Sequence, residues 1–147
     1  MNAFKEIFIM NTGDDATFDI LFEKALLGYN NAYVPYSNFK VGASMLLDDG
    51  KIYYGCNVEN SSYGLCNCAE RTTLFKAYSE GIRKENIKAF LVIGNTNRPI
   101  SPCGACRQVM TELLTLDTPV YLTNLEKKTY KVTVKDLLPY NFNGEDL

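Results

Sequence analysis

The segment Ser101-Pro102-Cys103-Gly104-Ala105-Cys106-Arg107-Gln108 is predicted to open a helix that carries two thiols on one face. Ser101 is a suitable N-cap, and Pro102 suits the first helical position because it has no amide hydrogen to leave unpaired there. Cys103 and Cys106 are three residues apart, so they share one face of one helical turn. The positive end of a helix dipole lowers the pKa of a thiol, and this segment is therefore suited to bind a metal ion through thiolates.

Hydrophobic patterning predicts two further helices and five strands around this segment. One helix ends near Asn31, and Asp14 or Asp15 can cap its start. The other runs from Asn67, a good N-cap, to Gly81, a residue type that favours a helix C-terminus. The expected strands are residues 39–47, 51–58, 88–93, 120–123 and 130–134.

The order of these elements predicts the fold class, an α/β three-layer α-β-α sandwich around a five-stranded mixed sheet. Asp48-Asp49-Gly50 joins the first two strands and predicts a hairpin. About six residues separate the last two strands, too few for a helical crossover, so these strands should be antiparallel. Residues 1–14 are interpreted as an N-terminal extension and residues 15–147 as a single domain.

The composition argues against nucleic acid as a partner. Apolar residues make up 46% and charged residues 22% of the chain, and the net charge is −2. No basic field is therefore available to hold a phosphate backbone. A chain of 147 residues also buries roughly 68–70% of its extended surface, so its core needs neither disulfides nor a metal.

Five cysteines and no histidine limit the possible chemistry. Without imidazole, the catalytic mechanisms that require histidine are excluded, and a transition metal must be bound mostly by thiolates. The apolar run Ile7-Phe8-Ile9-Met10 is four residues long, whereas the hydrophobic region of a signal peptide needs about 7–15 residues. No run approaches the ~18 residues of a membrane span. We therefore expect a cytoplasmic protein with reduced thiols and no membrane contact.

A third cysteine, Cys68, is predicted at the start of the second helix, as Cys103 and Cys106 are at the third. Three thiolates leave the fourth tetrahedral position open, as in catalytic zinc sites, and Glu70 could move a proton there. Two alternatives remain. Glu70 also occupies an ordinary capping-box position, and Cys66 could supply a fourth thiolate to a closed structural site. Spacing alone decides neither question.

Cys68-Ala69-Glu70-Arg71-Thr72 and the segment 102–108 resemble the two zinc motifs of the cytidine deaminases. They are most similar to the small homotetrameric nucleoside form, which uses three cysteines. The resemblance continues through residues 33–43, 55–60 and 137–147, and it covers about residues 18–147. Motifs that recur in order over most of a chain are far more specific than either motif alone.

This resemblance implies a role for each residue near the metal. Cys68, Cys103 and Cys106 would bind one zinc ion per subunit. Glu70 would take a proton from the attacking water, protonate the pyrimidine N3 and later pass a proton to the leaving amine. Arg71 would hydrogen-bond the cysteine sulfurs and offset part of their negative charge.

The resemblance also implies a substrate pocket. Asn57 and Glu59 would hydrogen-bond the ribose hydroxyls, and Phe39 would pack against the base. The backbones of Ala69 and Ser101 would recognise the edge of the base. Taken without the resemblance, Asn57 and Glu59 would be interpreted as solvated loop residues, and Phe39 as a core residue of a strand.

Tyr63 and Phe142 would reach a neighbouring subunit's site, so the resemblance implies a homotetramer. The expected activity is hydrolytic deamination of cytidine and 2′-deoxycytidine in pyrimidine salvage. One alternative is a deaminase of a different nucleoside, such as a nucleoside antibiotic. A polynucleotide-editing deaminase would need a basic groove and usually a histidine ligand, and this sequence has neither. A non-catalytic zinc module with four cysteines is the third alternative, and it would require Cys66 as a ligand.

Overall fold

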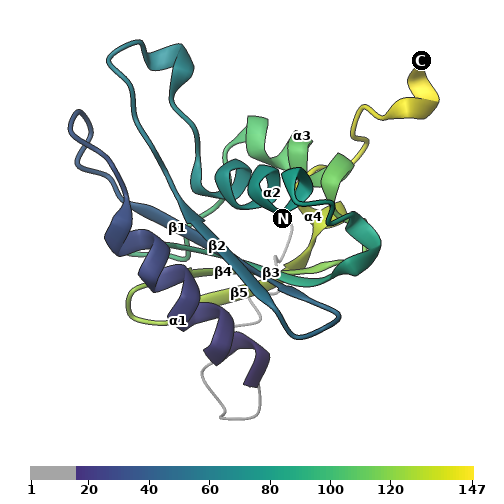
Figure 1. The fold of residues 1–147 in the computed structure, drawn as a ribbon, viewed down its shortest axis with the longest axis horizontal. Helices are drawn as coiled ribbons and strands as arrows, with labels where there is room; N and C mark the ends of the chain where they lie inside the picture. The colour runs from purple at the N-terminus through teal and green to yellow at the C-terminus, as the bar shows by residue number, and fades with distance from the viewer. Residues whose placement is uncertain (1–15) are drawn as a thin grey trace, which may run out of the picture.

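The computed structural model describes residues 16–147 (Figure 1). The predicted extension over residues 1–14 and the predicted caps Asp14 and Asp15 lie outside the described residues. The helices and strands follow one another as α1 (Ala16–Asn31), β1 (Val41–Leu47), β2 (Ile52–Cys56), α2 (Ala69–Ser79), β3 (Ile87–Gly94), α3 (Gly104–Leu113), β4 (Pro119–Asn124), β5 (Thr129–Thr133) and α4 (Val134–Leu137). Short 3₁₀ helices occupy Tyr63–Leu65, Lys84–Asn86 and Gly144–Asp146.

The five strands form one mixed sheet in the order β2-β1-β3-β4-β5. β3 and β4 are parallel, because α3 connects them by a crossover, and the other three pairs are antiparallel. The predicted mixed sheet is confirmed, including the hairpin of β1 and β2 and the antiparallel pairing of β4 with β5. The sequence did not predict the one-turn helix α4.

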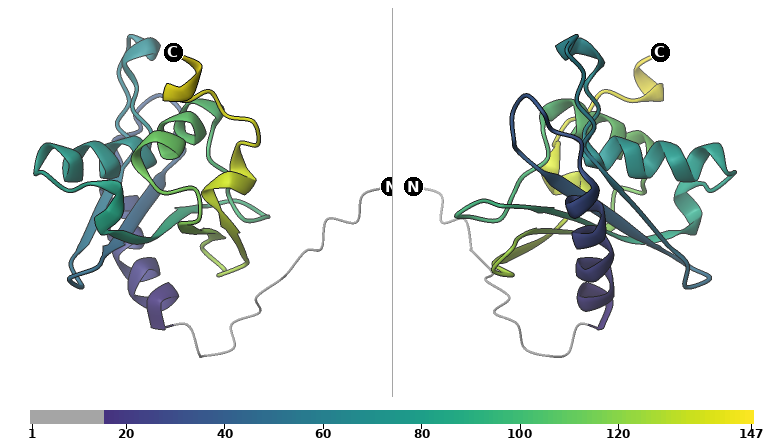
Figure 2. Two further views of the ribbon diagram at one scale, coloured as in Figure 1. Left: turned by 90° about the vertical axis from the view of Figure 1, so that its right-hand side faces the viewer. Right: turned by 60° about the vertical axis from the view of Figure 1, so that its left-hand side comes forward.

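Helices cover both faces of this sheet, which confirms the three-layer sandwich (Figures 1 and 2). α1 lies on one face, whereas α2, α3 and α4 lie on the other. Side chains alternate along the central strand β3, because successive residues of a strand point to opposite faces. Leu91 and Ile93 join the core beneath α1, and Phe90 and Val92 join the core beneath the other helices.

α1 approaches the sheet so closely that backbone meets backbone. A Cβ atom on Gly28 would lie 2.2 Å from the carbonyl oxygen of Gly55, and one on Gly42 would lie 2.0 Å from the carbonyl oxygen of Ala25. Only glycine allows such an approach. These contacts fix α1 against the start of β1 and the end of β2, where the chain enters the loops of the candidate site.

α2 begins one residue later than the sequence predicted. Its N-cap is Cys68, not Asn67, whose side-chain amide donates to the Thr72 hydroxyl at 3.0 Å instead. Glu70 is therefore the second helical residue and not the third, and α2 has no side-chain cap hydrogen bond. The capping-box interpretation of Glu70 is wrong. Gly81 follows the helix with φ of 91°, as its predicted role at the helix end requires.

α3 begins two residues later than predicted. Cys103 is its N-cap, and its sulfur accepts a hydrogen bond from the Cys106 amide, whereas Ser101 and Pro102 precede the helix. The Ser101 hydroxyl does not cap the helix because it accepts from the Arg107 guanidinium at 2.5 Å. Both helices thus begin at a cysteine, and each of these cysteines has extended backbone dihedrals. Within residues 16–147, no helix is long and apolar enough to cross a membrane.

Candidate active site

Three thiols from two helix starts meet at one point. The Sγ atoms of Cys68, Cys103 and Cys106 all lie within 4.8 Å of one another, and those of Cys68 and Cys103 are 3.9 Å apart. A tetrahedral zinc ion with Zn–S bonds of about 2.3 Å separates its sulfurs by about 3.8 Å. The cluster therefore fits a zinc ion, with a fourth position left for another ligand.

The groups around Cys68 favour the thiolate form of its side chain. The Cys106 amide donates to the Cys103 sulfur at 3.4 Å, and Arg71 Nη2 donates to the Cys68 sulfur at 3.5 Å. Hydrogen bonding, first from Cys106 and then from Arg71, lowers the pKa of Cys68 to about 5 despite its partial burial. Hydrogen bonding to Cys68, together with burial, raises the pKa of Cys106.

The Arg71 guanidinium interacts mainly with the cysteine sulfurs. Its hydrogen bond to Cys68 is the main cause that raises the pKa of the guanidinium. Its Nε atom is buried and, among the described side chains, has no hydrogen-bond partner. A guanidinium kept in such a place offsets part of the negative charge that three thiolates would bring to a metal ion.

Cys66 lies outside the thiol cluster. Its sulfur accepts from the Asn60 amide at 3.3 Å and lies 3.6 Å from the Asn60 carbonyl oxygen. This side chain points away from the three clustered thiols, and the described residues contain no fourth cysteine in the cluster. The arrangement is therefore that of an open site and not of a closed four-cysteine site.

Glu70 is a buried carboxyl in the first turn of α2. It is 4% exposed, and such deep burial is unusual for a glutamate. Burial raises its pKa to about 7, and the nearby Cys68 sulfur acts in the same direction. A carboxyl that exchanges its proton near neutral pH is suited to act as both a general acid and a general base.

Asn57 holds the segment that enters β1. Its Oδ1 accepts from the Val41 amide at 2.9 Å, and its Nδ2 donates to the Phe39 carbonyl at 2.8 Å. The sequence did not predict this contact, which fixes where Phe39 lies. An amide has two N–H donors and two acceptor positions, so Asn57 keeps a second donor for another partner.

Glu59 holds the turn just before that segment. One carboxylate oxygen accepts from the amides of Tyr36 and Ser37 at 3.0 and 3.1 Å. Hydrogen bonding to Ser37 is the largest cause that lowers the pKa of Glu59. The carboxylate is therefore charged at neutral pH, and its second oxygen can accept from another donor.

Phe39 and Ser101 lie close together in the fold, although they are 62 residues apart in the sequence. Both line a depression of about 200 Å³ with residues of the loop after β3, namely Thr96, Arg98, Pro99 and Ile100. Phe39 is 44% exposed and is thus not the core residue that a strand position suggests. Ala69, by contrast, is fully buried at the start of α2.

Tyr63 and Phe142 are exposed in the single chain, by 74% and 59%. Tyr63 lies in the loop before α2 and packs edge-on against Tyr36, with the ring centroids 6.0 Å apart. Phe142 lies in the segment after α4. Figure 2 shows that both this segment and the loop before α2 project from the body of the molecule.

The two residues that follow Cys106 have contacts that the sequence did not predict. Arg107 donates to the carbonyls of Pro102 and Leu137, at 2.9 and 2.8 Å, in addition to the Ser101 hydroxyl. Gln108 Nε2 donates to the Phe142 carbonyl at 2.9 Å. Their position directly after Cys106 was the available signal in the sequence, but that position does not reveal their distant partners.

A family model, the zinc-binding region of cytidine and deoxycytidylate deaminases, matches residues 17–122. The fold and the cluster of three cysteines thus define the class of zinc-dependent deaminases.

The individual relatives of this chain indicate which family within this class it belongs to. A cytidine deaminase of Halalkalibacterium halodurans is 54% identical over 128 residues, which cover 87% of this chain and 96% of the relative. A cytidine deaminase of Sporosarcina psychrophila is 56% identical over 116 residues, which cover 79% of this chain and 84% of the relative. The crystal structure of cytidine deaminase from Burkholderia pseudomallei superposes with a TM-score of 0.82 at 52% identity, covering 84% of this chain and 98% of that one. This chain belongs to the cytidine deaminase family.

Proposed function

We propose that this protein catalyses the hydrolytic deamination of cytidine and 2′-deoxycytidine to uridine and 2′-deoxyuridine, with release of ammonia. The observation that carries this proposal is the convergence of three thiols beside a buried carboxyl, Glu70, whose pKa is raised to about 7. The relatives named as cytidine deaminases support the choice of substrate.

Cys68, Cys103 and Cys106 are the residues that would hold the metal, one zinc ion per subunit. When bound, zinc activates a water molecule as the nucleophile that attacks C4 of the pyrimidine. Arg71 keeps the Cys68 sulfur in its thiolate form through the 3.5 Å hydrogen bond. It also limits the charge that the three ligands transfer to the metal.

Glu70 moves the protons of the reaction. It accepts one proton from the attacking water and delivers it to N3 of the base. It then transfers the remaining hydroxyl proton to the amino group, so that ammonia leaves and the C4 carbonyl of uridine forms. Because its pKa is close to neutral, neither the uptake nor the release of a proton costs much free energy.

Five residues would position the nucleoside. Phe39 packs against the base in the depression that it shares with Ser101, whose backbone, with that of Ala69, recognises the base edge. The second Asn57 donor and the second Glu59 oxygen bind the ribose hydroxyls. Since their other polar atoms hold the loop around Phe39, these two residues couple recognition of the sugar to recognition of the base.

Neighbouring subunits would complete each site. Tyr63 and Phe142, which are exposed in the single chain, reach a neighbour's pocket within a homotetramer. Residues 15–147 act as one domain on a free nucleoside and not on a polynucleotide, in keeping with the net charge of −2. The place of this reaction is pyrimidine salvage in the cytoplasm.

Ammonia release from cytidine tests the function directly. Zinc-loaded protein should release one ammonia for each uridine formed, chelation should stop the reaction, and added zinc should restore it. The absence of ammonia release from zinc-loaded protein would refute the proposal.

Two cysteine variants separate the open site from a four-cysteine module. Cys66→Ala should keep both zinc and activity, because its sulfur bonds to Asn60 and not to the cluster. Cys103→Ala should lose both. Loss of zinc from the Cys66→Ala protein would favour a structural zinc module instead.

A further inference from the structure

Two side chains of α3 hold the segment that follows α4. Arg107 Nη1 donates to the Leu137 carbonyl at 2.8 Å, and Gln108 Nε2 donates to the Phe142 carbonyl at 2.9 Å. Both acceptors are backbone atoms, so these bonds place the chain itself and not merely a side chain. The two anchors lie on either side of Tyr140.

Tyr140 adopts a strained conformation between these anchors. Its φ is 55°, in the left-handed region that residues with a Cβ atom avoid, and its side chain is fully exposed. Burial of this side chain therefore does not compensate for the strain. The anchors at Leu137 and Phe142 oppose relaxation of this part of the chain.

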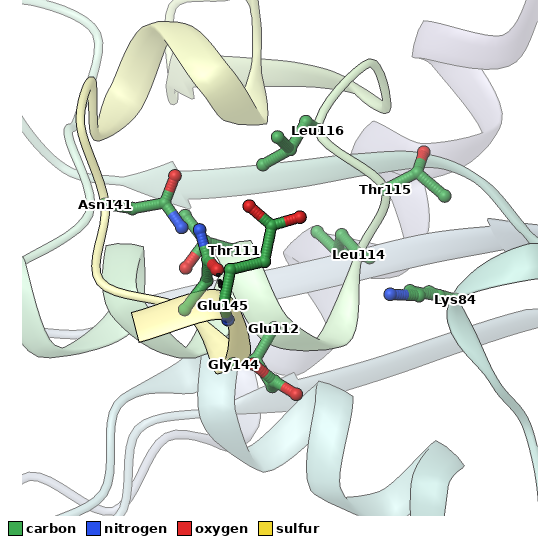
Figure 3. Close-up of a pocket in the computed structure, with 10 residues that line it drawn as sticks. Lys84, Thr111, Glu112, Leu114, Thr115, Leu116, Asn141, Gly144 and Glu145 are labelled. Atoms are coloured by element: carbon green, nitrogen blue, oxygen red, sulfur yellow. Dashed lines mark hydrogen bonds between the residues drawn. The ribbon is translucent and has the colours of Figure 1, made fainter. Parts of the chain in front are cut away.

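A cavity of about 470 Å³ separates the end of α3 and the following loop from the C-terminal segment (Figure 3). Thr111, Glu112 and Leu114 line one side of the cavity, and Asn141 and Glu145 line the other. The Gln108 hydrogen bond ties the Phe142 backbone to α3 beside this cavity, where close packing cannot do so.

Arg107 links the same segment to the entrance of α3. Its remaining donors bind the Pro102 carbonyl and the Ser101 hydroxyl, next to the thiol cluster. A planar guanidinium serves three acceptors in fixed directions, which an ammonium group on a flexible chain does not. One side chain thus aligns the start of the metal-binding helix with the end of α4.

We infer that Arg107 and Gln108 are positioning residues that set where Phe142 is presented to a neighbouring subunit's site. This inference rests on the proposed function, in which Phe142 completes that site. Neither residue takes part in the chemistry. Their effect should therefore appear in the KM for cytidine, which reports substrate binding, and not in kcat or zinc content.

A double-mutant cycle in the zinc-loaded, full-length protein tests this inference. Gln108→Glu preserves the side-chain shape but removes the donor to Phe142, so KM should rise roughly three- to tenfold, the effect of one lost hydrogen bond. Phe142→Ala should raise KM at least as much. The double variant Gln108→Glu/Phe142→Ala should match Phe142→Ala alone, because the role of Gln108 depends on Phe142.

Three further variants complete the test. Gln108→Lys restores a donor and should recover part of the KM. Arg107→Lys keeps the charge but loses the three-acceptor geometry, and it should raise KM. Glu23→Gln, an acid-to-amide change at an exposed position of α1 on the opposite face of the sheet, is the control and should change neither constant. The melting temperature of each variant, measured in parallel, shows whether the fold is intact.

The possible failures are distinguishable. If Phe142→Ala raises KM and Gln108→Glu does not, or if their effects are additive, the inference is wrong and the proposed function stands. If Phe142→Ala leaves KM unchanged, both the inference and the proposed role of Phe142 are wrong. Zinc-dependent ammonia release tests the deaminase activity separately.

Discussion

Glu70 owes its proposed role to its surroundings and not to its place in a motif. A glutamate in the first helical turn is usually solvated and charged. Glu70 is 4% exposed, and burial raises its pKa to about 7. The carboxyl is therefore able to hold a proton under the conditions in which the proposed reaction takes place.

Glu70→Gln should separate metal binding from proton transfer. The amide fills the same volume but cannot accept a proton, so turnover should fall about 10²- to 10⁴-fold while zinc content and fold are kept. Ammonia release and zinc analysis of the same sample measure both quantities. Near-normal turnover by this variant would exclude Glu70 as the proton carrier.

Glu59 acts through its charge at a turn. The pKa of its carboxyl is lowered in the folded state, mainly by hydrogen bonding to Ser37, so the ionised form stabilises the fold. This contribution is complete above the unfolded pKa of about 4.5 and is lost as pH falls through the lower folded value.

Glu59→Gln should therefore be less stable than the parent protein at pH 7, and the difference should shrink below about pH 4. Urea denaturation at both pH values measures this change. Glu23→Gln, at an exposed position of α1, serves as the control and should show no difference at either pH. A deficit that is equal at both pH values would show that the charge of Glu59 does not stabilise the turn.

At the scale of elements, the starts of α2 and α3 are the critical features. Each helix begins at a cysteine with extended backbone dihedrals, which directs the two sulfurs toward one point. Side-chain propensity had favoured Asn67 and Ser101 as caps. In the structure, the Asn67 side chain instead hydrogen-bonds Thr72, and the Ser101 hydroxyl hydrogen-bonds Arg107.

The contact of α1 with β1 is the element-scale feature most sensitive to mutation. Gly42→Ala would place a Cβ atom 2.0 Å from the Ala25 carbonyl oxygen, and backbone cannot move aside as a flexible side chain can. We expect a loss of about 3 kcal/mol or more in the free energy of unfolding. Chemical denaturation measures it.

Gly64→Ala is the matched control for this substitution. A Cβ atom there would meet no heavy atom within 4 Å, so stability should stay within about 0.5 kcal/mol. Equal stability of the Gly42→Ala and Gly64→Ala proteins would show that α1 can shift away from the sheet at little cost.

At the scale of the whole molecule, apolar side chains gather on the loops beside the candidate site. Tyr36, Tyr63 and Leu65 are between 50% and 74% exposed, and the first two pack against each other. Contiguous apolar surface is typical of an interface between proteins. This surface supports the proposal that a neighbouring subunit covers the loops.

Sedimentation velocity should therefore detect a species four times the mass of the chain. Leu65→Asp, which places a charge in this apolar surface, should shift the protein to smaller species and raise KM, because the sites lose the neighbour's side chains. Lys51→Asp, at the exposed turn between β1 and β2, should do neither. A fully active monomer would contradict the proposed assembly.

Much of the fold follows from local patterns. Residues of β3 alternate between two cores, and the five strands lie within two residues of their predicted bounds. The helix starts were less predictable, by one residue at Cys68 and two at Cys103. A hydrogen bond from a distant residue, such as that of Arg107 to Ser101, competes with local propensity there.

The sequence by itself determined the kind of chemistry. With no histidine, a metal had to be held by thiolates, and Cys68, Cys103 and Cys106 were spaced to supply them. The order of helices and strands also determined the mixed sheet between two helical layers. These properties are local, because residue type and spacing are enough to define them.

Only the tertiary structure decided which groups converge. It directed Cys66 to Asn60 and away from the cluster, and it buried Glu70 so that its pKa rose. It also joined Gln108 to the Phe142 carbonyl across 34 positions of the chain. Burial and convergence depend on contacts between residues far apart in sequence, and no local pattern of residue types contains that information.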